Sequence, residues 1–174
     1  MAGSLIKIDE EIVTSAVASV TLTGIDSTYD VYMVKVNNVA PDVANRILYM
    51  RVTEGGTANT TANYDYAYKG LRADTSFGNL SGTNITFWQT NGGYGSSTGT
   101  GQTMNGVFYL FNFNNASEYS FITNETANIT GGSDLKAGQG GGVFTSTSSC
   151  DGLYFYFNVN NINSGVFTLY GLAK

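Results

Sequence analysis

The sequence contains no histidine and a single cysteine. Without histidine, the Ser-His-Asp and Cys-His catalytic arrangements cannot form, and the commonest protein ligand for zinc and non-haem iron is missing. The lone Cys150 excludes a disulfide within the chain. We expect it to be a small, buried, unreactive residue beside the start of a strand. Most hydrolytic mechanisms are therefore excluded.

Charged residues are also scarce, at 12% of the chain, with a formal net charge of -5. The eight lysines and arginines stand singly. Because phosphate binding requires a clustered basic face, nucleic acid is not an expected partner. The low charge does not indicate disorder, since disordered chains are poor in aromatic residues and 13% of this chain is aromatic.

No long apolar run is present. The apolar residues of Ala2–Val20 are interrupted by Asp9, Glu10 and Glu11, and no positively charged segment precedes them. We therefore expect neither a signal peptide nor a contact with membrane. A chain of 174 residues is long enough to bury the core of one domain without a metal or a disulfide.

Sequence motifs for cofactor or metal binding are missing as well. The glycine-rich segments 91–101 and 138–142 lack the frame that cradles phosphate, and no calcium-binding loop follows Asp26 and Asp30. The acidic residues are scattered, so their spacing identifies no catalytic pair of the glycosidase kind. The sequence predicts a protein that is not an enzyme, with no cofactor and no metal.

Short segments of alternating apolar and polar residues dominate the chain and predict strands. A helix over Asp9–Ala18 is a weaker alternative, because Val, Thr and Ser favour an extended backbone. About ten strands are expected, over Ser4–Ile8, Val17–Thr23, Tyr29–Asn37, Arg46–Thr53, Tyr64–Gly70, Asn84–Thr90, Gly106–Phe113, Tyr119–Asn124, Gly142–Thr147 and a final pair within residues 150–174.

This pattern predicts an all-β fold, an antiparallel β-sandwich of jelly-roll type, with a closed barrel as the alternative. Residues 14–174 would form a single domain, and residues 1–13 are a candidate N-terminal arm. Gly55–Asn63, Asn91–Gly101 and Gly131–Gly141 are too rich in glycine for strands and are expected to be long surface loops.

Three alternating tyrosines, Tyr64, Tyr66 and Tyr68, are the candidate ligand-binding residues. Exposed aromatic rings stack on sugars, and tyrosine is favoured at interfaces. The favoured interpretation is that these rings form a half-buried face of the sheet packed by a neighbouring strand or subunit, because aromatic pairs across strands commonly stabilise sheets.

Five segments together resemble a group of short virion structural proteins from tailed bacteriophages. They are GIDSTYDVYMVKVNNVAP (24–41), ILYMRVTEGG (47–56), GVFYLFNFNN (106–115), CDGLYFYFN (150–158) and SGVFTLYGL (164–172). The order and spacing of these segments carry the resemblance, which covers the chain from about Val17 onward. It implies a structural component of the particle, without catalytic residues.

The resemblance implies a capsid decoration (cement) protein on the outside of the head shell, present as a homotrimer that contacts the major capsid protein. It would be assembled in the cytoplasm of the host bacterium and lie on the outer surface of the virion. A tail-fibre or tail-tip module that binds a glycan receptor through glycine-rich loops is the alternative.

The N-terminal segment supplies the candidate contacts with a neighbouring subunit or with the shell. Leu5, Ile6 and Ile8 could add a strand to a neighbouring sheet. An ordinary first strand of the same domain is the other interpretation of these residues.

Overall fold

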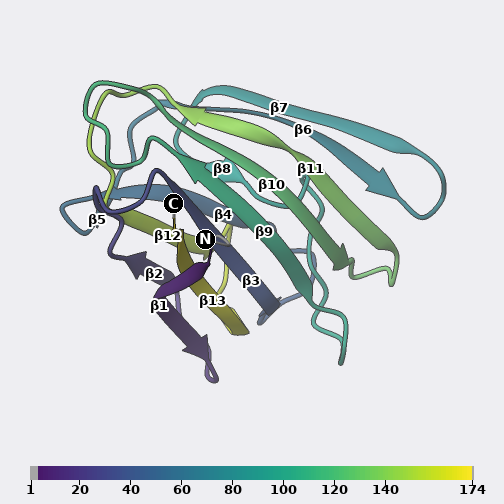
Figure 1. Ribbon diagram of the computed structural model, residues 1–174. Coiled ribbons are helices and arrows are strands. Elements are labelled where there is room, and N and C mark those ends of the chain that lie inside the picture. The colour runs from purple at the N-terminus through teal and green to yellow at the C-terminus, as the bar shows by residue number, and fades with distance from the viewer. Residues whose placement is uncertain (1–3, 174) are drawn as a thin grey trace.

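The computed structural model describes residues 4–173, and this part of the chain forms thirteen strands and no helix (Figure 1). The all-β prediction is therefore confirmed, with more strands than expected. The strands are β1 (Leu5–Val13), β2 (Val20–Thr23), β3 (Val31–Pro41), β4 (Leu48–Glu54), β5 (Thr57–Ala58), β6 (Tyr64–Arg72), β7 (Phe77–Ile85), β8 (Trp88–Gln89), β9 (Met104–Phe111), β10 (Ser120–Ile129), β11 (Leu135–Phe144), β12 (Gly152–Phe157) and β13 (Ile162–Leu172).

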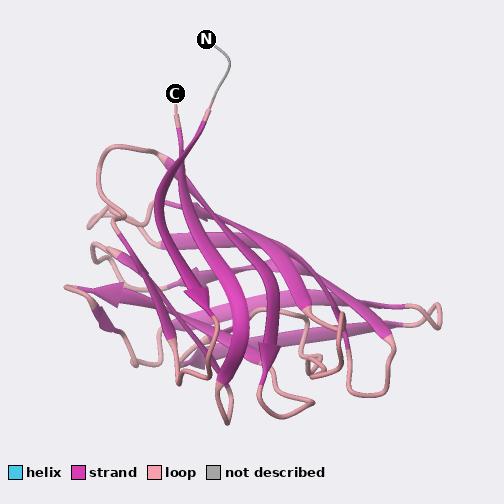
Figure 2. Cartoon of the chain, turned by 90° about the horizontal axis from the view of Figure 1, so that it is seen from below, coloured by secondary structure: helices cyan, strands magenta, loops and turns pink. Residues whose placement is uncertain are grey.

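The strands form two antiparallel sheets that pack as a β-sandwich. The large sheet has eight strands in the order β1-β13-β3-β9-β10-β11-β6-β7, and the small sheet has the order β2-β12-β4-β5, with β8 also paired to β4. The ends of β1 and β13 lie side by side (Figure 2), because Leu5 pairs with Leu172. This order does not establish a jelly roll. Within residues 4–173, β1 and β7 lie at opposite ends of the large sheet and do not pair, so this sheet is not a closed barrel.

The core lies between the two sheets. Alternation places every second side chain of a strand on the same face, and the apolar set faces inward. In the small sheet these are Leu48, Met50 and Val52 of β4, which are fully buried. The Phe155 ring of β12 packs against Phe167 of the large sheet, with ring centroids 5.2 Å apart. Burial of each such side chain stabilises the fold by about 1.5–3 kcal/mol.

Strand β11 overturns the prediction that Gly131–Gly141 is a surface loop. Ten residues, Leu135–Phe144, pair with β10 on one side and β6 on the other. A Cβ atom on Gly140 would lie 2.1 Å from the Tyr68 ring, and one on Gly142 would lie 2.6 Å from Nε1 of Trp88. Glycine is present because large rings on neighbouring elements cover the backbone of this strand.

Of the other two glycine-rich segments, residues 55–63 lie at the surface as predicted, whereas residues 91–101 are partly buried. Residues 55–63 contain the short strand β5. The loop after β8 folds inward, and Asn91 and Ser96 are fully buried against the large sheet. Asn124 Nδ2 donates a hydrogen bond of 2.8 Å to the Thr90 carbonyl and fixes the start of this loop. The loop therefore extends the second layer of the sandwich.

The described part of the chain contains no helix that is long and apolar enough to cross a membrane.

Candidate functional site

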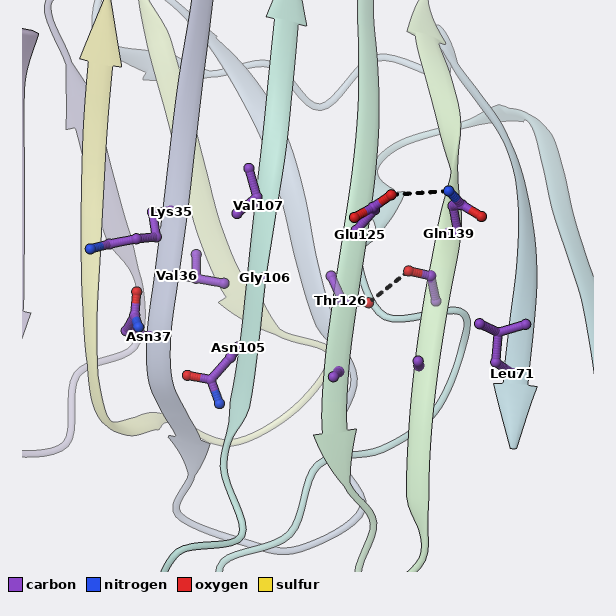
Figure 3. A pocket seen from close by; sticks show the side chains of 13 residues that line it. Lys35, Val36, Asn37, Leu71, Asn105, Gly106, Val107, Glu125, Thr126 and Gln139 are labelled. Carbon is purple, nitrogen blue, oxygen red and sulfur yellow. Dashed lines mark hydrogen bonds between the residues drawn. The ribbon is translucent and has the colours of Figure 1, made fainter. Parts of the chain in front are cut away.

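The outer face of the large sheet, opposite the core, carries a shallow groove of about 630 Å³ (Figure 3). Strands β3, β9, β10 and β11, which lie side by side in the sheet, supply most of its residues. It is lined by Lys35, Val36, Asn37, Leu71, Asn105, Gly106, Val107, Glu125, Thr126, Ala127, Ala137, Gly138 and Gln139. The groove therefore brings together residues that are up to about a hundred positions apart in the sequence.

Two rows of paired residues define the groove. In one row Ala127 pairs with Asn105 on one side and Ala137 on the other, so two small side chains form the floor. In the next row Glu125 pairs with Val107 and with Gln139. The polar side chains of Glu125 and Gln139 therefore lie next to a shallow apolar surface formed by Ala127 and Ala137.

The polar groups of the groove keep unused hydrogen-bonding capacity among the described residues. Gln139 Nε2 donates a 3.0 Å hydrogen bond to Glu125 Oε1, which leaves Gln139 Oε1 and the second carboxylate oxygen for a ligand (Figure 3). Asn105 Oδ1 accepts a 3.0 Å bond from the Asn38 backbone, so its amide NH2 remains. Asn37 Oδ1 is buried without a partner.

A second groove of about 490 Å³ continues the first along the sheet and shares Val107, Glu125 and Gln139 with it. Tyr109 of β9 lines this second groove and pairs with Thr123 of β10. The Tyr109 side chain is 41% exposed. An aromatic ring thus stands next to the polar row, on the same face.

The three candidate tyrosines lie elsewhere, and their rings are buried, as the packed-face interpretation predicts. Tyr64, Tyr66 and Tyr68 are 0%, 7% and 4% exposed. The Tyr64 hydroxyl donates to the Asn59 carbonyl and accepts from the Val52 amide, and burial raises the pKa of Tyr64 and of Tyr68. The rings belong to the core face of β6.

The candidate contact residues Leu5, Ile6 and Ile8 lie on β1, which pairs with β13 of the same chain along its whole length. Leu5 is 51% and Ile6 is 44% exposed, whereas Ile8 packs against the core near Gly24. The segment is therefore the first strand of the domain in this structure and forms one edge of the large sheet. It is not a separate arm here.

The reactive side chains of Cys150, Asp151 and Asp65 are buried or hydrogen-bonded within the fold. Cys150 is fully buried, and its burial raises the thiol pKa to about 11. Both carboxylate oxygens of Asp151 accept hydrogen bonds, from Thr53 Oγ1 and from the Gly56 amide. Asp65 Oδ1 accepts a 2.7 Å hydrogen bond from the Asn84 backbone amide. Within residues 4–173 no cluster of three or more His, Cys, Asp and Glu residues could hold a metal.

The groove was not predicted from the sequence, because its residues come from strands that are neighbours only after folding. The alternating pattern of Val107, Tyr109 and Phe111 on β9 was the available signal for an outward face. It does not specify which strands pair with β9.

No model of a known protein family matches this chain, and no curated protein sequence matches it. The functional proposals therefore depend on the chain's own residues.

Proposed function

We propose that this chain is a non-enzymatic structural protein of a tailed-phage virion, a capsid decoration protein that binds the outside of the head shell and stabilises it. The segments that resemble such proteins support this proposal. They form β3, β9 and β13, which are adjacent in the large sheet, and β4 and β12, which are adjacent in the small sheet. The resemblance therefore coincides with the central strands of the sandwich.

The observation that carries the proposal is the free edge at β1. This strand has nine residues, and among the described residues no strand pairs with its outer side. Leu5 and Ile12 are 51% and 61% exposed on it. A long edge strand with exposed aliphatic side chains is suited to pair with a second protein.

At this edge the chain would contact the major capsid protein and neighbouring copies of itself. A contact between the β1 edge and a different surface of the next copy is heterologous, and three such contacts close into a homotrimer. The bulge between Lys7 and Asp9, together with the 2.7 Å hydrogen bond that the Thr23 amide donates to Asp9 Oδ2, limits uncontrolled strand addition.

Reconstitution on head shells that lack the protein tests this proposal. Leu5→Glu combined with Ile12→Glu places two carboxylates on the β1 edge and is expected to abolish attachment in a co-sedimentation assay. Val159→Glu is the matched control, because Val159 is 52% exposed and lies in the turn between β12 and β13. Attachment that survives the double substitution would exclude the β1 edge as the contact.

The alternative, a tail-fibre or tail-tip module, differs in copy number. A decoration protein is present in proportion to the major capsid protein, whereas a tail component is present in few copies. Quantitative mass spectrometry of purified particles distinguishes the two.

A further inference from the structure

We propose that the groove on the outer face of the large sheet binds a neutral oligosaccharide. This site is on the outer face of the sheet, not in the glycine-rich loops. The inference does not depend on attachment to the head shell. It would hold whether the chain decorates the head or belongs to the tail.

Hydrogen bonding is the first reason for a sugar. Asn105, Glu125 and Gln139 stand on three successive strands, β9, β10 and β11, which are spaced about 4.8 Å apart. Their unused groups include an amide donor, an amide acceptor and a carboxylate acceptor. Sugar hydroxyls both donate and accept, so a chain of them can satisfy these three groups, which lie in two neighbouring rows of the sheet.

The aromatic ring is the second reason. Tyr109 is 41% exposed and borders the same row, since it lies two residues from Val107 on the outward side of β9. An exposed tyrosine offers an apolar ring surface with a polar hydroxyl at its tip. The apolar C–H face of a sugar ring can stack on it while the hydroxyls reach Glu125 and Gln139.

The surroundings exclude other ligand classes. Glu125 places a carboxylate in the middle of the groove, which disfavours a phosphate backbone. Lys35 lies at the margin of the groove (Figure 3). The pKa of Glu10 is lowered mainly by its hydrogen bond with Lys7, and the positive charge of Lys35 lowers it further. A peptide that adds a strand needs a free edge, but β9 and β10 are paired on both sides.

Binding to an array of neutral oligosaccharides, comprising glucans, galactans and N-acetylglucosamine oligomers, tests the site. We expect at least one of these classes to bind. Tyr109→Ala and Gln139→Ala should each lower the affinity for that oligosaccharide roughly tenfold or more, as loss of a stacking or hydrogen-bonding partner does. Tyr119→Ala is the matched control, because Tyr119 is 43% exposed and does not line the groove.

Three results would overturn the inference: no oligosaccharide class binds, binding survives both groove substitutions, or Tyr119→Ala weakens binding as much as Tyr109→Ala does. Circular dichroism of each variant establishes that it is folded. Leu5 and Tyr109 line one pocket, so the two proposals are separated with Ile12 and Gln139 instead. Ile12→Glu alone should still bind the oligosaccharide, because Ile12 does not line the groove, and Gln139→Ala should still attach to shells. Failure of one proposal is thereby distinguished from failure of the other.

Discussion

Gly140 and Gly142 of β11 allow two large rings to pack directly on a strand. Tyr68 lies against Gly140, and the Trp88 indole lies against Gly142. The indole Nε1 also donates a 3.1 Å hydrogen bond to the Asp65 carbonyl. Glycine has a low strand propensity, but here the packing of neighbouring rings outweighs that preference.

Gly140→Ala is therefore expected to destabilise the protein by about 1–3 kcal/mol, the usual cost of overpacking a core. The new methyl group would meet the Ala67 carbonyl at 2.3 Å, and backbone cannot move aside cheaply. Urea denaturation measures the loss. Gly132→Ala is the control, because its nearest contact is an ordinary 3.5 Å. Equal stability of the two variants would contradict this account of β11.

Cys150 is expected to be chemically inert in the folded protein. The thiolate is the reactive form, and burial raises the thiol pKa to about 11, so little thiolate is present near neutral pH. Iodoacetamide should label the native protein far more slowly than the urea-unfolded protein, as measured by mass spectrometry. Equal labelling rates would show that the thiol is accessible.

At the residue scale, the sequence predicts shared faces better than it predicts which face is buried. Alternation correctly groups Tyr64, Tyr66 and Tyr68 on one side of a strand. It does not say which side faces the core, because that depends on the partners that cover the strand. Here the Trp88 and Phe144 rings pack against Tyr64, and neither residue is a neighbour in the sequence.

At the element scale, most strands could be predicted because their period-two patterns are strong. Strand β11 could not, since the low strand propensity of its four glycines outweighs the pattern of its few apolar residues. The groove could not be predicted either. It depends on the register of β3, β9, β10 and β11, and only β10 and β11 are joined by a short turn.

The buried loop after β8 provides a test at this scale. Asn124 Nδ2 bonds to the Thr90 carbonyl, and Asn128 Nδ2 bonds to the Gly95 carbonyl at 3.3 Å. Asn124→Ala leaves a buried carbonyl with one partner fewer, which costs about 1–3 kcal/mol. Hydrogen exchange of the loop amides should become faster.

Thr123→Ala is the control for that experiment, because Thr123 is the adjacent residue on β10 and faces outward. Its hydrogen exchange and stability should match those of the unsubstituted protein. If Asn124→Ala also leaves the loop amides unchanged, the asparagine does not fix the loop.

At the scale of the whole molecule, stability should fall in alkaline solution. Burial raises the pKa of the Cys150 thiol to about 11 from 9.0 and raises the pKa of Tyr64 and Tyr68 above 10.0. The folded protein then holds protons that the unfolded chain releases, so the free energy of unfolding decreases as pH rises above about 9. Below about pH 9 these groups are protonated in both the folded and the unfolded state, so they do not change the free energy of unfolding.

Urea midpoints measured across neutral and alkaline pH test this expectation. Ionisation of these groups should leave the urea midpoint unchanged up to about pH 9 and lower it at higher pH. Tyrosinate absorbance should report ionisation of the buried tyrosines only as the protein unfolds. A midpoint that rises above pH 9 would contradict the assigned burial.

We propose that this sandwich is a structural protein attached to the outside of a phage head. A cryo-electron microscopy reconstruction of the particle tests it most directly. The account predicts trimeric density on the outer surface of the shell that fits this fold, with the β1 edge against the major capsid protein. Density for the fold at the tail alone, or none on the particle, would contradict it.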